Sequence, residues 1–120
     1  MKPDEVMALT DIELNEVSLK LLGDAGRMEF FIEHGWDPTH DIAAAWELVN
    51  AAKDVEYWMS AEYKLVYGEF IDYEAGWEVL FRGVGVENSG KTDFPERHFA
   101  IGDTMPCAIT RAFILAMEPE

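Results

Sequence analysis

The chain has 120 residues, of which 49% are hydrophobic, so it has the length and the apolar content of one domain with one hydrophobic core. Its formal net charge of -15 disfavours binding to DNA or to anionic membranes, but a small anionic ligand near one arginine stays compatible with it. Cys107 is the only cysteine, which excludes an intrachain disulfide and predicts a reducing cytosol. No apolar stretch approaches the ~20 residues that a membrane-spanning helix needs.

Residues 2–22 carry apolar side chains at mostly helical spacing and are followed by Gly23. This pattern predicts one helix, with Thr10 as the place of any break. Residues 23–40 contain Gly26, Gly35 and Pro38 around an apolar group, which predicts a turn, a short packed element and a second turn.

Residues 39–53 have the spacing of an amphipathic helix whose first turn is capped by Thr39 or Asp41. Its predicted apolar face consists of Ile42, Ala45, Trp46, Val49 and Ala52.

After residue 58, apolar side chains recur at every second position instead of at helical spacing. Residues 59–67 and 76–81 alternate between apolar and other side chains, and residues 68–75 between them suit a turn, which predicts an antiparallel hairpin of two or three strands. Residues 97–101 suit a short strand. Asp103 or Thr104 then caps a last helix that runs to about Met117, with Pro106 in its first turn.

These elements predict a single domain, residues 1–120, of the α+β class. We expect a small antiparallel sheet packed with N-terminal, central and C-terminal helices, in which residues 1–35 form an N-terminal helical part and residues 36–117 form the core.

The last helix is apolar on nearly every side, which predicts burial by its own sheet and by a partner chain. Arg111 is the one charge in its body, and its guanidinium needs an acceptor. A phosphate or carboxylate of a ligand would fill that role bidentately. The alternative is a plain salt bridge, or an exposed head on a buried stem.

Residues 83–95 are rich in turn formers, which predicts a mobile loop. Arg82 and Arg97 flank this loop and Lys91 lies within it, so its backbone amides and these cations suit a phosphate. Phe81 ends a predicted strand at the mouth of the loop, and Asn88 lies in the loop, where a ring can stack on a base and an amide can read a base edge. The alternative is an ordinary hairpin loop with solubilising charges.

Catalysis and metal binding have little support in the sequence. His34, Asp37, His40 and Asp41 form a short run without the spacing of a known metal motif. Cys107 lies in an apolar helix and suits a small buried hydrophobe better than a nucleophile. We therefore expect no cofactor, no metal and no enzymatic activity.

Three separated blocks resemble the phage ABA sandwich domain family: residues 36–47 (WDPTHDIAAAWE), 76–81 (GWEVLF) and 106–113 (PCAITRAF). Together they span residues 36–117, and the first 35 residues lie outside the resemblance. Within that family are the Thoeris anti-defence sponges of the first type.

The resemblance implies a homodimer or hexamer in the host bacterial cytoplasm. Such a protein binds glycocyclic ADP-ribose without cleaving it, and some members also hold cyclic trinucleotides. The resemblance places Arg111 of the final helix in the ligand site, with Thr110 beside it, and approximately Phe81 and Asn88 from the loop. A second arginine one turn away is absent, because Cys107 and Leu115 occupy those positions.

Two other functions stay open at this point. An acidic protein-interaction module would inhibit a host protein through its charge. A hydrolase of the signal would release altered nucleotides.

Overall fold

A computed structural model describes residues 2–22, 35–67, 73–83 and 97–117, with the side chains of residues 64–67 and 73–75 left aside. Within these residues the fold is α+β, as predicted, with four helices and a three-stranded antiparallel sheet. In chain order the elements are α1 (Pro3–Ala8), α2 (Asp11–Leu21), α4 (Ile42–Asp54), β1 (Tyr57–Tyr67), β2 (Tyr73–Gly83), β3 (Arg97–Gly102) and α5 (Met105–Met117).

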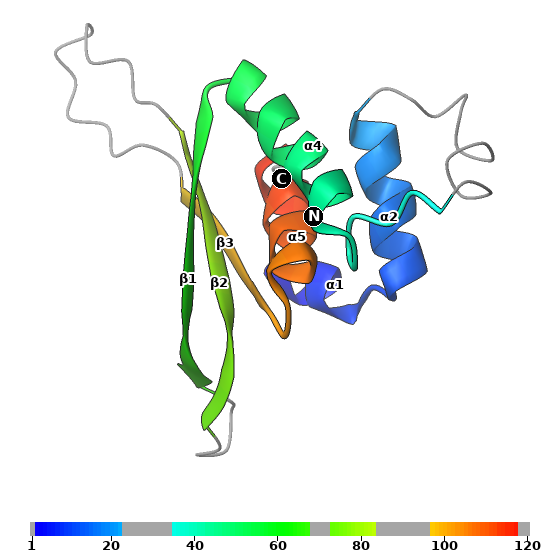
Figure 1. Cartoon of the computed structure of the whole chain (residues 1–120). Coiled ribbons are helices and arrows are strands. Elements are labelled where there is room, and N and C mark those ends of the chain that lie inside the picture. The colour runs from blue at the N-terminus through cyan, green and yellow to red at the C-terminus, as the bar shows by residue number, and fades with distance from the viewer. Residues whose placement is uncertain (1, 23–34, 68–72, 84–96, 118–120) are drawn as a thin grey trace, which may run out of the picture.

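The described helices all lie on one side of the sheet, whose strand order is β1-β2-β3 (Figure 1). The sheet therefore has one face that packs on helices and one face that no described helix covers. We call the second one the open face.

The N-terminal segment forms two helices that meet at Thr10, where the sequence allowed a break. The Thr10 hydroxyl accepts a hydrogen bond from the Glu13 amide at 3.2 Å, and the Glu13 carboxylate accepts one from the Thr10 amide at 3.0 Å. This capping box satisfies amides that would otherwise lack a partner in the first turn of α2. The predicted element within residues 23–34 lies outside the described residues.

Helix α4 begins after Asp41, whose carboxylate accepts a hydrogen bond from the Ala43 amide at 3.0 Å. Its predicted apolar face is wrong in part. Ile42 and Trp46 are 47% and 46% exposed, and the fully buried large side chain is Leu48. Three alanines surround Leu48 on the buried side, at positions 44, 45 and 52. Such small side chains let α4 approach α5 closely, so close packing decides the buried face more than total hydrophobicity does.

The hairpin of β1 and β2 has the predicted alternation. Met59 and Ala61 lie opposite Phe81 and Val79, and all four side chains are on the helix-packed face. Strand β2 begins at Tyr73, so residues 73–75 continue the sheet and do not belong to the turn that was predicted for them. Strand β3 confirms the strand predicted for residues 97–101.

Helix α5 lies in the middle of the core, where it contacts β3, β2, α4, α2 and α1. Its buried side chains include Ile109, Phe113 and Ile114, which are 0% exposed. The chain itself therefore covers a helix that is apolar on nearly every side. The sequence argument for a partner chain on this helix no longer applies.

Candidate functional site

Arg111 extends from α5 to the end of β3, where its Nη1 donates a hydrogen bond to the Ile101 carbonyl oxygen at 2.8 Å. The side chain is partly buried, and its Nε atom is buried with no hydrogen-bond partner among the described residues. The acceptor is thus a backbone carbonyl, which neither the salt bridge nor the ligand of the sequence analysis foresaw. In this position the guanidinium joins the central helix to the sheet.

Two further predicted site residues belong to the interior. The Phe81 side chain is 0% exposed and packs in the core, so its ring is not accessible to a base in this structure. Thr110 is also 0% exposed, and its hydroxyl donates to the Pro106 carbonyl within α5 at 2.8 Å. Asn88 and Lys91 lie outside the described residues.

Arg82 and Arg97, in contrast, are brought together on the open face. They lie directly opposite each other on β2 and β3, and both are exposed. The alternation of a strand explains this placement: Phe81 points into the core, so the next residue, Arg82, points away from it. The tertiary structure thus places two of the predicted cations next to each other.

Trp58 of β1 lies opposite Arg82 on the other side and completes a row across the three strands. Its side chain is 59% exposed, and the Lys53 ammonium lies 6.0 Å from the centre of its ring. We call Trp58, Arg82 and Arg97 the basic row. The sequence analysis did not single out Trp58. The signal that would have found Trp58 is the hairpin register, which pairs it with Arg82.

The electrostatics of the basic row favour a bound anion. Like charges directly opposite each other on a sheet are destabilising. Within the described part of the chain, neither Arg82 nor Arg97 forms an ion pair. Two adjacent arginines without an ion pair among the described residues place two positive charges side by side at this end of the open face. An exposed indole beside them offers a flat apolar surface for a base.

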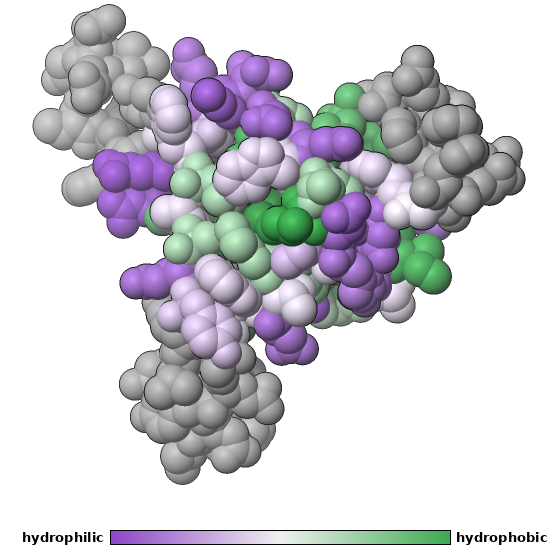
Figure 2. Space-filling view, in the orientation of Figure 1, coloured by the Kyte–Doolittle hydropathy of each residue, from purple (hydrophilic) through white to green (hydrophobic). Residues whose placement is uncertain are grey.

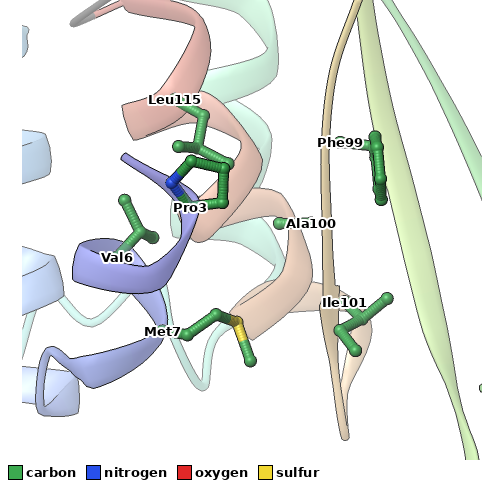
Figure 3. A pocket seen from close by; sticks show the side chains of 7 residues that line it. All are labelled: Pro3, Val6, Met7, Phe99, Ala100, Ile101 and Leu115. Atoms are coloured by element: carbon green, nitrogen blue, oxygen red, sulfur yellow. The ribbon is translucent and has the colours of Figure 1, made fainter. Parts of the chain in front are cut away.

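A concave region lies between α1, β3 and α5, apart from the basic row (Figure 3). It is lined by Pro3, Val6, Met7, Phe99, Ala100, Ile101 and Leu115, none of which carries a charge. The concave region between α1, β3 and α5 therefore lacks the cations that an anionic ligand would need. Figure 2, in the orientation of Figure 1, also shows an apolar area near the centre of the surface, bordered by hydrophilic residues.

Asp37 and His40, from the short run that the sequence analysis considered for metal binding and did not favour, contact each other. The His40 Nδ1 lies 2.7 Å from Asp37 Oδ2, and its Nε2 lies 3.1 Å from Asp11 Oδ2. Asn15 and Thr39 donate to Asp37 Oδ1 at 2.8 and 2.6 Å. Burial raises the pKa of Asp37, but the hydrogen bonds from Thr39, Asn15 and His40 outweigh it and hold that pKa below its ordinary value.

This cluster joins the start of α2 to the turn before α4. Asp41, the third member of the run that can be placed, caps α4, while His34 lies outside the described residues. Among the described residues no group of three or more acidic, histidine or cysteine side chains is arranged to hold a metal ion.

Cys107 is partly buried on α5, and this burial raises the pKa of its thiol above the ordinary value. A raised pKa lowers the fraction of reactive thiolate at neutral pH. The Thr39 hydroxyl is buried and donates to Asp37, so it is not presented to a substrate.

Comparison with known proteins found no matching family model, no similar characterised protein and no similar solved structure. The resemblance to phage ABA sandwich domains therefore rests on the three sequence blocks. None of the described helices has the length and apolar content to cross a membrane.

Proposed function

We propose that this protein is a phage anti-defence protein that binds and withholds a small cyclic nucleotide immune signal in the cytoplasm of the host bacterium, without degrading it. The observation that supports this most directly is the basic row, where an exposed indole and two guanidinium groups lie side by side in a protein of net charge -15. The three sequence blocks supply the class of ligand, glycocyclic ADP-ribose or a cyclic trinucleotide.

Each side chain of the basic row has a separate role in the proposed binding of the nucleotide. Neighbouring strands lie about 4.8 Å apart, so Arg82 and Arg97 reach one phosphate or the two phosphates of a diphosphate. Each planar guanidinium grips phosphate oxygens bidentately. The Trp58 ring stacks on the base, which any purine or pyrimidine accepts. Arg111 and Phe81 support the fold in this proposal and do not touch the nucleotide.

Sequestration needs affinity and a high protein concentration, and it needs no transition-state stabilisation. A row of two cations and an aromatic ring supplies affinity without a nucleophile. The proposal therefore assigns no catalytic residue and no cofactor.

Isothermal titration calorimetry with glycocyclic ADP-ribose tests the site, with a cyclic trinucleotide as the second probe. Hydrogen bonds to charged groups contribute about 1.5–3 kcal/mol each, so we expect Arg82→Ala and Arg97→Ala each to weaken binding about 10- to 100-fold. The double variant Lys2→Ala/Lys20→Ala removes two exposed cations elsewhere and controls for net charge. Equal affinity of the R82A/R97A and K2A/K20A proteins would exclude the basic row as the site.

The fate of the ligand tests sequestration. Protein incubated with the nucleotide is separated from solution and then heated, and the released material is analysed by mass spectrometry. Recovery of intact nucleotide supports withholding of the signal. Altered products that accumulate with turnover would instead make the protein a hydrolase.

A second candidate is an acidic interaction module that inhibits a host protein. The exposure of Trp58 and Phe99, each 59%, on the open face favours it, because exposed aromatic side chains mark protein interfaces. A host protein that co-purifies in a salt-sensitive way, together with no heat of nucleotide binding, would support this function over the first.

A further inference from the structure

Strand β3 lies at one edge of the described sheet, whose strand order is β1-β2-β3. An edge strand presents backbone N–H and C=O groups that an extended peptide can pair with, as an added strand. The apolar concave region between α1, β3 and α5 adjoins this strand (Figure 3). Unpaired backbone groups and an apolar surface would together form a peptide site if both lie on the same edge.

The lining of the concave region shows that it follows the edge of β3. Phe99 and Ile101 point to one side of the strand, away from the helical layer, whereas Ala100 points toward α5 (Figure 3). All three nevertheless line the same region. A surface that residues from both faces of a strand reach has to pass around the edge of that strand.

The hydrogen bond of Arg111 identifies the backbone groups that point outward from β3. The Ile101 carbonyl oxygen accepts this bond from α5, so we infer that it points away from β2. The direction of the backbone groups alternates along a strand, so those of Phe99 also point outward and those of Ala100 point toward β2. Within the described part of the chain, the outward N–H and C=O of Phe99 have no hydrogen-bond partner.

We propose that β3 binds an extended peptide segment of another protein, which adds to the sheet as a further strand and places one apolar side chain in the concave region. We call this segment the edge peptide. The concave region has a volume of about 140 Å³. A cavity of ~150 Å³ holds a benzene molecule, so this volume suits one side chain of the size of leucine.

The alternation of the strand predicts the chemistry of the edge peptide. Its residue opposite Ala100 points to the helical side and enters the concave region, whose lining carries no charge, so this residue should be apolar. Its residue opposite Arg97, three positions away, points to the open face. Arg97 is exposed and forms no ion pair with another described residue, so an acidic residue is complementary there.

Hydrogen bonding and charge favour a peptide strand over a small apolar molecule as the occupant. A small apolar molecule would use neither the outward groups of Phe99 nor the charge of Arg97. The added strand is short, because the Arg111 guanidinium already occupies the Ile101 carbonyl at the other end. A short strand buries less area than a standard interface, so we expect a Kd on the order of 10–100 μM.

Nuclear magnetic resonance of the isotope-labelled protein tests this site with the synthetic peptide acetyl-Thr-Leu-Thr-Val-Glu-amide. The peptide is written antiparallel to β3, the more stable pairing, with its leucine opposite Ala100 and its glutamate opposite Arg97. We expect saturable shifts of the Met7 and Phe99 amide signals. Hydrogen exchange of the Phe99 amide should slow, because its N–H then donates to the peptide.

N-methylated peptides separate strand addition from the docking of a side chain alone. A methyl group on the nitrogen of the threonine opposite Phe99 removes the donor to the Phe99 carbonyl, so it should weaken binding at least about 10-fold. The nitrogen of the leucine opposite Ala100 points away from β3, so its methylation should change the affinity by about two-fold or less. Equal affinities of the two methylated peptides would overturn the proposal.

Two protein variants test the side-chain contacts. Met7→Lys places a charge in the apolar region and should weaken the peptide about 10-fold or more. Ile12→Lys makes the same kind of change at an exposed position of α2 outside the region, and it should bind like wild type. Arg97→Glu should weaken the peptide about two- to five-fold and should prefer a peptide that ends in lysine.

The edge peptide does not depend on the nucleotide function, and its experiments contain no nucleotide. Met7→Lys should weaken the peptide without changing the affinity for glycocyclic ADP-ribose, so the two proposals can fail separately. Protection of the Phe99 amide that rises with protein concentration, without peptide, would assign the edge to a second copy and overturn the proposal. Unchanged Met7 and Phe99 signals up to about 1 mM peptide would overturn it as well.

Discussion

The partner of Arg111 in the structure differs from the one that the sequence analysis expected. A cation in an apolar helix needs an electronegative partner, and an anion was the expected one. The observed acceptor is the Ile101 carbonyl, at 2.8 Å. A backbone carbonyl carries a partial negative charge and costs free energy when it is buried without a donor. The guanidinium therefore satisfies a backbone carbonyl of the sheet.

The structural role of Arg111 predicts a loss of stability on substitution. Arg111→Met keeps much of the apolar stem but removes the donor to Ile101, so it should lower the free energy of unfolding by about 1–3 kcal/mol. Arg111→Ala should cost more, since it also removes the packing of the stem. Urea denaturation measures both. An R111M protein that unfolds like wild type but fails to bind nucleotide would return Arg111 to the ligand site.

Asp37 gives a pH-dependent contribution to stability. Its pKa in the folded protein lies below the ordinary value of 3.8, so its contribution is fully present above that value and is lost as the pH falls through the folded pKa. Asp37→Asn removes the titrating group. The stability difference between wild type and D37N should be largest near neutral pH and should shrink as the pH falls from about 5 to about 2.

Urea unfolding across this pH range measures that difference, and the comparison cancels the titration of the other carboxylates. Asp54→Asn is the matched control, because Asp54 is exposed and forms no side-chain hydrogen bond or ion pair with another element of the described residues. D54N makes the same change of Asp to Asn without removing the hydrogen bonds of Asp37. Parallel curves for D37N and D54N would contradict the role assigned to the Asp37 hydrogen bonds.

At the scale of elements, α4 is the helix whose predicted and observed faces differ most. Its apolar residues are spread too widely around the helix for the sequence to identify the buried stripe. The alanines at positions 44, 45 and 52 settle the choice, since they allow α4 to lie close to α5. Larger side chains such as Trp46 remain at the margin.

This assignment predicts unequal costs for two substitutions of similar chemistry. Leu48→Ala should lower the free energy of unfolding by about 2–5 kcal/mol, because Leu48 is 0% exposed and its removal leaves a cavity. Ile42→Ala should cost about 1 kcal/mol or less, since Ile42 is 47% exposed. Chemical denaturation of both variants checks the order. A larger cost for I42A would restore the face predicted from periodicity.

At the scale of the whole molecule, the few cations matter by position more than by number. The net charge of -15 opposes any polymer of phosphates, whose many charges must approach a broad surface. The basic row is small enough for one or two phosphates. Under the proposed function, the overall charge and the local charge of the basic row would together favour a small anion.

This balance predicts no binding to nucleic acid polymers. Fluorescence anisotropy with a labelled DNA duplex at about 150 mM salt should show no binding at protein concentrations that saturate with a cyclic nucleotide. The R82E/R97E protein should give the same flat signal. Salt-sensitive binding of the duplex by wild type would show that the open face acts on polymers after all.

The sequence by itself determined the fold class and most of the described elements. The possible break at Thr10, the helix start at Thr39 or Asp41, the alternation in the hairpin and the apolar last helix depend on residues close together in the chain, so local sequence patterns reveal them. It also identified Arg82 and Arg97 as candidates.

Only the tertiary structure decided where each candidate lies and what it contacts. Sheet register joins Arg82, Arg97 and Trp58 across three strands, and helix packing buries Phe81 and turns Arg111 toward Ile101. Register and packing depend on contacts between residues far apart in the chain, and a one-residue change in register would exchange the two faces of a strand. Local periodicity does not show which distant residues a face will contact, so the candidate site could not be identified from the sequence alone.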